Sequence, residues 1–406
     1  MQVLLSSIGS RGDVQPLVAL GVELQALGHR ARLCVAPNFC EWVESYGLEC
    51  VPIGPDLKKM TGGTVARMIP RTPEEWKIIV DASVREQFAV IGGAARGCDV
   101  LVGAGALQIA LRSIADAQHV PYIFAAYCPA VLPSTKNPPP KNSDGSYPQD
   151  LPQDEIVRLW KQNDAEFNAR FGEVLNDERG KLGLPPVSSV RDTMFTDHPW
   201  LAADPVLAPA YPIPGLDLTQ TGAWMISNST PLPADVEAFL AAGAPPVYLG
   251  FGSMQALEQT GRKLIDAARS VGLRSVLSQG WAGLEPGAMG DGCLTIGDLN
   301  HAALFPRMAA IVHHGGAGTT QTAARAGRPQ VLIPHNYDQF YWAHRVQEMG
   351  VGVSGPTRDD LTVEALVDAL RLCLQPDMAA RAQDLASRME PDGARDAAER
   401  LTAEFA

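Results

Sequence analysis

The stretch HHGGAGTT, His313 to Thr320, decides the fold of the second half of the chain. It follows the apolar run Ala309–Val312 and precedes a helical segment at Gln321–Ala326, which predicts a strand, a glycine turn and a helix start. The unpaired N–H groups of a helix start attract anions, and glycines let a phosphate reach the main chain. With His313 and Thr319 as further donors, the stretch predicts a diphosphate site. The stretch matches neither the P-loop nor the GxGxxG pattern of other phosphate-binding loops. The alternative is an ordinary tight turn whose glycines allow close packing.

Strands and helices alternate through this second half. Apolar runs typical of buried strands are separated by segments of helical periodicity, which predicts a parallel sheet with helices on both faces. The predicted strands are Val247–Ser253, Arg274–Leu277, Cys293–Gly297, Ala309–His314 and Gln330–Pro334. The predicted helices are Glu258–Val271, Gln339–Met349, Thr362–Leu374 and Met378–Phe405.

The first half shows the same alternation. Leucines recur at helical spacing after the first strand, with Pro16 in the first turn and Gly28 at the end. The predicted strands are Val3–Ser7, Arg32–Val35, Cys98–Gly105 and Pro121–Tyr127, and the predicted helices include Ala106–Gln118 and Glu155–Leu182. Between them, Pro129–Gln153 is rich in Pro, Lys, Asn and Ser, which predicts a long mobile loop.

The fold class is therefore α/β, with two Rossmann-like doubly wound domains facing across a cleft. A length of 406 residues also favours two domains. We expect a first domain over residues 1–205, a linker over 206–222 and a second domain over 223–385. Residues 386–406 are expected to form a helix that folds back onto the first domain.

Composition narrows the function classes. A net charge of −12 disfavours nucleic acid and anionic membrane surfaces as partners. No apolar run approaches the 18 or so residues of a membrane span, and the start MQVLLSSIGS is typical of a buried strand rather than a signal peptide. Seven scattered cysteines without a CxxC pair predict free thiols in a reducing cytoplasm. No Cys or His spacing predicts a metal site.

Polar residues follow several predicted strands, where open α/β sheets bind ligands. In GSRGDVQP, Gly9–Pro16, the Asp13 carboxylate is either a general base or a helix N-cap, and the pattern leaves the two equal. Arg11 either steers an anion or is solvated. In PHNYDQ, Asp338 and Gln339 suit sugar hydroxyls, with an N-cap and a surface amide as the alternative.

Three further residues lie at the same edges. Trp281 follows a strand and can stack on a nucleobase, although a hydrophobic plug between the halves is nearly as plausible. Ser253 follows the first strand of the second half, where we expect its hydroxyl to contact phosphate. His335 is a weaker candidate, because a lone histidine is more often structural.

Several motifs together resemble one known family. They are GSRGDVQP, GAPPVYLGFGSM, SQGW, HHGGAGTTQTAARAGRPQVLIP and DQFYWAHRV, and they resemble the GT-B glycosyltransferases of family 1, particularly the vancomycin group of antibiotic glycosyltransferases. The resemblance covers nearly the whole chain and is weakest from about Met60 to Gln153, the region of acceptor contacts in that family. It implies a GT-B architecture, with the acceptor in the first domain and the nucleotide sugar in the second.

The resemblance also implies residue roles. Asp13 matches the catalytic base. The other matched positions contact the donor: Ser10, Arg11 and Gly12 beside it, His313, Gly315, Gly316, Gly318 and Thr319 at the diphosphate, Ser253 on the donor side, Trp281 and Leu299 over the base, and Asp338 and Gln339 at the hexose.

The implied reaction is an inverting transfer of a hexose. The donor is a UDP or dTDP sugar, and the acceptor is a hydroxyl of a hydrophobic aglycone such as a glycopeptide or polyketide. The resemblance implies no metal, no further cofactor and no integral membrane association. Three alternatives stay open: a sterol or lipid glucosyltransferase, a non-catalytic nucleotide-sugar-binding accessory protein, and a sugar-nucleotide epimerase of the same architecture.

Overall fold

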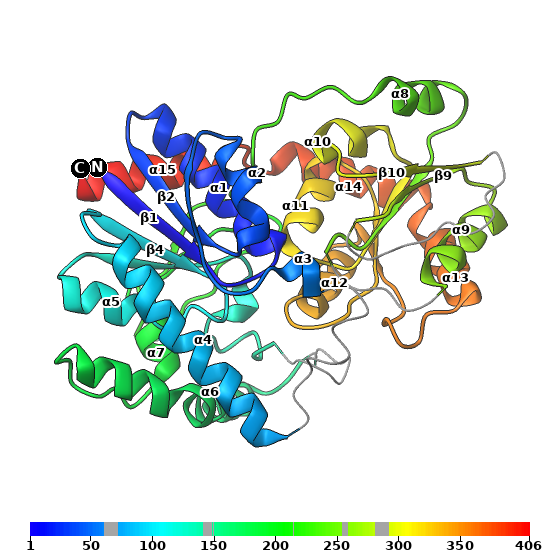
Figure 1. Ribbon diagram of the computed structural model, residues 1–406. Helices are drawn as coiled ribbons and strands as arrows, with labels where there is room; N and C mark the ends of the chain where they lie inside the picture. The colour runs from blue at the N-terminus through cyan, green and yellow to red at the C-terminus, as the bar shows by residue number, and fades with distance from the viewer. Residues whose placement is uncertain (61–71, 141–147, 149, 214, 254–258, 281–291) are drawn as a thin grey trace.

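The computed structural model describes residues 1–60, 72–140, 148, 150–213, 215–253, 259–280 and 292–406. Two parallel sheets, each flanked by helices, form the two lobes of the molecule (Figure 1). Their strand orders are β3-β2-β1-β4-β5-β6-β7 and β10-β9-β8-β11-β12-β13. Both orders change direction around the first strand of their half, which confirms the predicted doubly wound α/β class.

The first sheet is buried on both faces. Its strands are β1 Gln2–Ser7, β2 Arg30–Val35, β3 Glu49–Pro52, β4 Val100–Ala104, β5 Tyr122–Ala126, β6 Trp200–Leu201 and β7 Thr219–Gln220. Its helices are α1 Arg11–Ala26, α2 Cys40–Glu44, α3 Leu57–Met60, α4 Pro73–Ala94, α5 Leu111–Gln118, α6 Gln153–Lys181 and α7 Val190–Phe195. Alternate β1 residues separate the two cores, with Val3 and Leu5 facing α1 and Leu4 facing α5.

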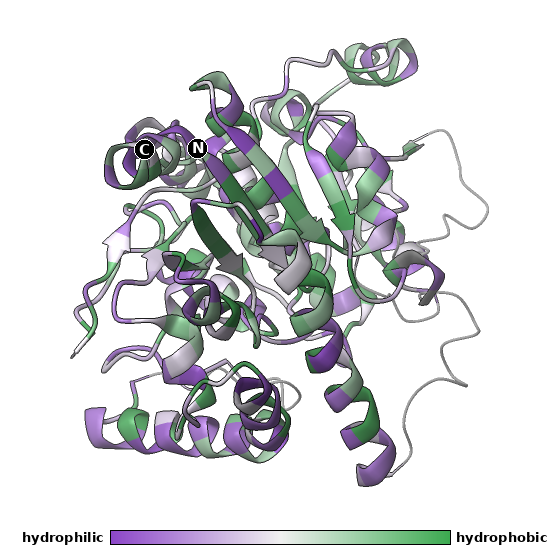
Figure 2. Ribbon diagram, turned by 60° about the vertical axis from the view of Figure 1, so that its left-hand side comes forward, coloured by the Kyte–Doolittle hydropathy of each residue, from purple (hydrophilic) through white to green (hydrophobic). Residues whose placement is uncertain are grey.

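The second sheet has the same construction. Its strands are β8 Val247–Gly250, β9 Ser275–Ser278, β10 Cys293–Ile296, β11 Ala310–His313, β12 Gln330–Leu332 and β13 Gly352–Ser354. Its helices are α8 Ala234–Ala241, α9 Thr260–Ser270, α10 His301–Leu304, α11 Ala317–Arg325, α12 Gln339–Glu348 and α13 Val363–Cys373. The strands are hydrophobic along most of their length, whereas the outer helices carry hydrophilic stripes (Figure 2).

The crossing between the halves differs from the expected linker over residues 206–222. Strand β7 pairs with β6, so Thr219–Gln220 extends the first sheet. Trp224 also lies in the core of that sheet, because its ring packs edge-on against Trp200. The chain therefore leaves the first lobe only after Trp224, in the extended segment before α8 (Figure 1).

The end of the chain folds back onto the first lobe. The helix expected over Met378–Phe405 is two helices, α14 Pro376–Arg388 and α15 Gly393–Phe405. Pro391 separates them, because proline disfavours helical geometry in the residue before it and lacks an N–H. Helix α15 packs along α1 (Figure 1). A Cβ on Gly393 would lie 2.5 Å from the carbonyl carbon of Gly222, so the two crossing segments touch.

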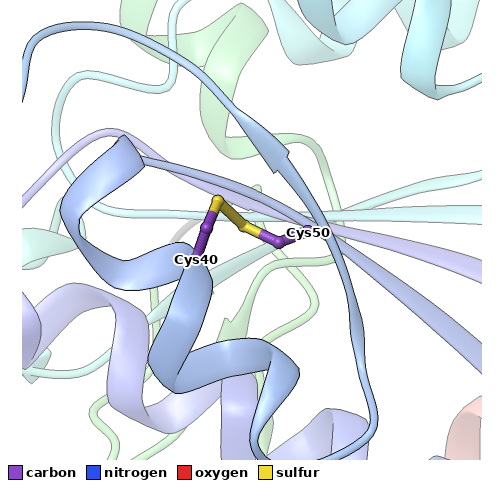
Figure 3. The surroundings of a disulfide bond; sticks show 2 residues. All are labelled: Cys40 and Cys50. Atoms are coloured by element: carbon purple, nitrogen blue, oxygen red, sulfur yellow. A yellow bond between two sulfur atoms is a disulfide. The ribbon is translucent and has the colours of Figure 1, made fainter.

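One disulfide contradicts the expectation of free thiols. Cys40 in α2 is bonded to Cys50 in β3 (Figure 3), while the other five cysteines are free. The local turn from α2 into β3 brings the two Cα atoms within 5.4 Å, and no sequence motif marks such a contact. The free-thiol argument for a reducing cytoplasm therefore loses part of its basis.

The segment Pro129–Gln153, expected as a mobile loop, starts with residues that are packed against the rest of the first lobe. Ala130, Leu132 and Asn137 are buried there. The indole N–H of Trp160, in α6, donates to the carbonyl of Asn137 at 2.8 Å. The described start of this segment is thus held against α6 and does not fit a mobile loop; residues 141–147 and 149 lie outside the described residues.

Candidate active site

Each sheet has a switch point where neighbouring strands lead to helices on opposite faces. In the first sheet it lies between β1 and β4, and in the second between β8 and β11. Open α/β sheets bind ligands at the carboxyl ends of such strand pairs. The loop with Asp13 follows β1, and the glycine turn follows β11. The two predicted clusters therefore occupy the two switch points.

Asp13 belongs to the first turn of α1. Its Oδ2 atom accepts hydrogen bonds from the backbone N–H of Ser10 at 2.8 Å and from the Ser10 hydroxyl at 3.1 Å. Ser10 is the N-cap, so the N-cap alternative for Asp13 is wrong, and the carboxylate instead completes a capping box. Burial raises the pKa of the Asp13 carboxyl, and the bonds from Ser10 oppose that shift.

Two glycines make room for this carboxylate. A Cβ on Gly9 would lie 2.3 Å from Asp13 Oδ2, so the carboxylate would have to shift. A Cβ on Gly105, after β4, would lie 3.4 Å from Asp13 Oδ1. The Oδ1 atom therefore faces the switch point between β1 and β4. The phenol of Tyr127 donates to the Asp13 carbonyl at 3.1 Å and fixes the helix start from the next strand.

Arg11 and Gly12 continue the same turn of α1. Gly12 is exposed, whereas the Arg11 guanidinium reaches across to the second lobe. Its Nη1 atom donates to Asp298 Oδ2 at 2.6 Å. Helices α1 and α11 also contact each other. The loop with the candidate base and the glycine turn therefore lie where the two lobes contact each other.

His313, expected as a phosphate donor, is fully buried in β11. Its Nδ1 accepts the backbone N–H of Gly315 at 3.1 Å, so the ring proton is on Nε2 and is donated to Gln330 Oε1 at 2.9 Å. Burial lowers the pKa of His313 to about 4 and keeps the ring neutral. The ring has no N–H left for a ligand, and its place differs from the expectation.

His314, which sequence reasoning missed, is the histidine at the turn. Its Nδ1 atom is buried and has no partner among the described residues. Its Nε2 atom lies 2.5 Å from the position that a Cβ on Gly316 would occupy. Burial lowers its pKa to about 3. Side chains alternate between faces along a strand, so the sequence could have shown that His313 and His314 point to opposite faces, but not which of them meets a ligand.

The remaining residues of the glycine turn lead into the first turn of α11. Gly315 adopts φ +89°, a conformation that glycine allows, and Gly316 is the N-cap of α11. Gly318 is exposed, and a Cβ there would meet nothing within 4 Å. The backbone N–H groups of Ala317, Gly318 and Thr319 have no partner in the part of the chain that the structure describes. The helix start is therefore free to receive an anion.

Asp338 and Gln339 begin α12 but have different surroundings. Asp338 Oδ2 accepts the indole N–H of Trp342 at 3.1 Å. Burial raises the pKa of Asp338 to about 7, and the charge of Asp13 acts in the same direction. The Gln339 amide instead accepts the backbone N–H groups of His335 at 2.8 Å and Asn336 at 3.2 Å. Gln339 thus holds its own loop together.

The other candidates are placed as follows. Ser253 is half-buried in the turn after β8, and Leu299 is half-buried after β10. Trp281 lies outside the described residues. Both ring nitrogens of His335 are buried without a partner among the described residues, and the ring packs against Phe251 with centroids 4.9 Å apart.

Two kinds of feature are absent from the described ranges. They contain no group of three or more His, Cys, Asp or Glu side chains placed to hold a metal ion. Nor does any helix within them have the length and apolar character needed to cross a bilayer.

Two family models match the chain. Residues 3–131 match the glycosyltransferase family 28 N-terminal domain, and residues 282–399 match the C-terminal domain of erythromycin biosynthesis protein CIII-like proteins. The chain is 44% identical to a vancomycin aglycone glucosyltransferase of Amycolatopsis orientalis, over 99% of this chain and 97% of that protein. It is 39% identical to a dTDP-epi-vancosaminyltransferase of the same organism, over 94% and 92%.

Solved structures agree on the fold. The glycosyltransferase VinC in complex with dTDP has a TM-score of 0.71 at 22% identity and covers 99% of both chains. The glycosyltransferase of kitacinnamycin has a TM-score of 0.73 at 20% identity, over 100% of this chain and 99% of that one. The chain therefore belongs to the GT-B glycosyltransferases, in the group of the vancomycin aglycone glucosyltransferases, and is a hexosyltransferase.

Proposed function

We propose that this protein transfers a hexose from a UDP or dTDP sugar to a hydroxyl of a hydrophobic natural-product aglycone, with inversion at the anomeric carbon. The observation that carries the proposal is the meeting of the two switch points. The carboxylate of Asp13 belongs to the first lobe and the open start of α11 to the second; α1 contacts α11, and the Arg11–Asp298 ion pair joins the lobes. The relatives named above act on a vancomycin aglycone or use a dTDP sugar.

The donor side is proposed to stabilise the leaving diphosphate. Negative charge develops on its oxygens as the glycosidic bond breaks, and preorganised N–H donors lower the energy of that charge. The free N–H groups at the start of α11 and the Thr319 hydroxyl are the donors in this proposal, with His314 in the role first expected of His313. The proposal assigns no step to a metal ion.

The acceptor side is proposed to supply the base. The acceptor hydroxyl attacks the anomeric carbon on the face opposite the diphosphate, while Asp13 removes its proton. Oδ1 is the atom suited to this, because Oδ2 is held by Ser10.

Residues 1–205 would hold the acceptor and residues 223–385 the donor, with 386–406 packed on the first lobe. Asp338 is proposed to bind hexose hydroxyls and Ser253 the phosphate, while Gln339 keeps the Asp338 loop in shape. The cytoplasm remains the predicted location.

A donor and acceptor panel tests this function. Purified protein is incubated with UDP- and dTDP-hexoses and with phenolic, glycopeptide, polyketide and sterol aglycones, and products are read by mass spectrometry. A sterol belongs in the panel because the chain is 30% identical to a sterol 3-beta-glucosyltransferase of Arabidopsis thaliana, of which it covers 63%. We expect hexosylated glycopeptide or polyketide. Nucleotide binding without transfer to any aglycone would favour the accessory-protein alternative, and an isomerised donor would favour the epimerase.

A further inference from the structure

Arg11 is held by side chains from both lobes. Its guanidinium, at the start of α1, donates to Asp298 in the loop after β10 at 2.6 Å. The two side chains are 37% and 73% exposed, so water reaches the pair. Exposed ion pairs of this kind contribute little to stability, because solvent screens their attraction. The contact is therefore easy to exchange for another anion.

The ring of Trp42 stacks against the same guanidinium, and we call this contact surface the Trp42 shelf. The Cζ atom of Arg11 lies 4.8 Å from the centroid of the Trp42 ring, within cation–π range. Trp42 belongs to α2, which the Cys40–Cys50 disulfide ties to β3 (Figure 3). The shelf is thus part of the first lobe and keeps its place whichever anion the guanidinium meets.

The Asp298 loop is anchored separately in the second lobe. The side-chain oxygen of Asn300 caps α10 by accepting backbone N–H groups of its first turn. The side-chain nitrogen of Asn300 donates to the backbone carbonyls of Asn228 and Thr230, both at 2.9 Å. Burial lowers the pKa of the neighbouring His301 to about 4; the positive charge of Arg11 acts in the same direction, and the negative charge of Asp298 opposes it. The ion pair with Asp298 places the guanidinium beside the loop after β10, at the carboxyl ends of the strands of the second sheet, where open α/β sheets bind ligands.

We propose that the donor diphosphate competes with Asp298 for Arg11, so that Asp298 weakens donor binding. This inference rests on the proposed function. In the structure, Asp298 holds the guanidinium between the two lobes. The diphosphate offers more negative charge and the same oxygen geometry to the guanidinium fork, so Arg11 exchanges one partner for the other on the Trp42 shelf. Asp298 is a positioning residue that acts through Arg11.

Calorimetric titration with UDP and dTDP tests the competition. Asp298→Asn keeps the size of the side chain and removes its charge, and we expect it to bind the preferred nucleotide about two- to five-fold more tightly than the wild type. The control is Asp368→Asn, since Asp368 is 76% exposed and pairs with Arg371 within α13. Its affinity should stay at the wild-type value. Unchanged or weaker binding by Asp298→Asn overturns the inference.

A double-mutant cycle separates competition from a general effect on the fold. In an Arg11→Gln background, Asp298→Asn should no longer change nucleotide affinity, because the group through which it acts is gone. Trp42→Leu should weaken binding about two- to five-fold through loss of the shelf. An undiminished effect of Asp298→Asn in the Arg11→Gln background contradicts the inference alone. If the wild type binds neither nucleotide, the proposed function fails as well.

Discussion

The imidazole rings of His313 and His314 lie 6.3 Å apart and nearly perpendicular, and they have different surroundings. His313 spends both nitrogens on Gly315 and Gln330, whereas His314 has a buried nitrogen without a partner among the described residues. Of these two adjacent histidines, His313 therefore has a structural role, and His314 keeps a ring nitrogen available for a ligand.

The two histidines should respond differently to substitution. His314→Ala is expected to weaken UDP or dTDP binding by about 1.5–3 kcal/mol, the value of a hydrogen bond to a charged group. His313→Ala should instead lower stability by about 1–3 kcal/mol, since it leaves Gln330 unpaired in the core. Calorimetry and urea denaturation on the same samples separate the two. Equal losses of affinity in both variants would count against the assignment to His314.

The alternating strands were predictable because each is a continuous apolar run, as in Val100–Ala104. Helix α4 was not anticipated, since Trp76 and Ile78 at its start are exposed and blur its periodicity. The Cys40–Cys50 pairing depends on a tertiary contact that the spacing does not reveal. Asp298 was missed for the same reason, because its partner lies 287 residues away.

Gly9 should be required for the position of the base. In Gly9→Ala the new Cβ would overlap Asp13 Oδ2, so the carboxylate must move and the rate of transfer should fall by at least about tenfold. The control is Gly92→Ala in α4, where a Cβ meets nothing within 4 Å. Steady-state kinetics and nucleotide titrations measure both. Normal turnover by Gly9→Ala would mean that the carboxylate position does not matter.

Asp338 should make stability depend on pH. Its folded-state pKa of about 7 lies above the ordinary 3.8, so the folded protein keeps a proton that the unfolded chain releases. Stability is therefore lost as pH rises from about 4 to 7. Asp338→Asn removes this loss and should be more stable than the wild type at pH 8, by at least about 1 kcal/mol, but not at pH 4. Urea denaturation at both values tests it, and a constant difference would contradict the shift.

The Cys40–Cys50 disulfide should stabilise the first lobe. Closing a loop of ten residues is worth about 2–3 kcal/mol, so Cys40→Ser should lower the melting temperature. Reductant should lower that of the wild type and leave Cys40→Ser unchanged. Cys293→Ser, at a free and half-buried thiol, serves as the control. A wild type that is insensitive to reductant would show that the bond contributes no stability.

The most direct test of the central claim is the turnover of Asp13→Asn, measured with nucleotide affinity and melting temperature on the same sample. Asparagine keeps the size of the side chain and its ability to accept from Ser10, and it removes only the base. With an aliphatic-alcohol acceptor, which needs the base most, we expect turnover to fall by about 10²–10⁴ while nucleotide affinity and stability stay near wild type. Near-normal turnover would contradict the assignment of Asp13 as the base.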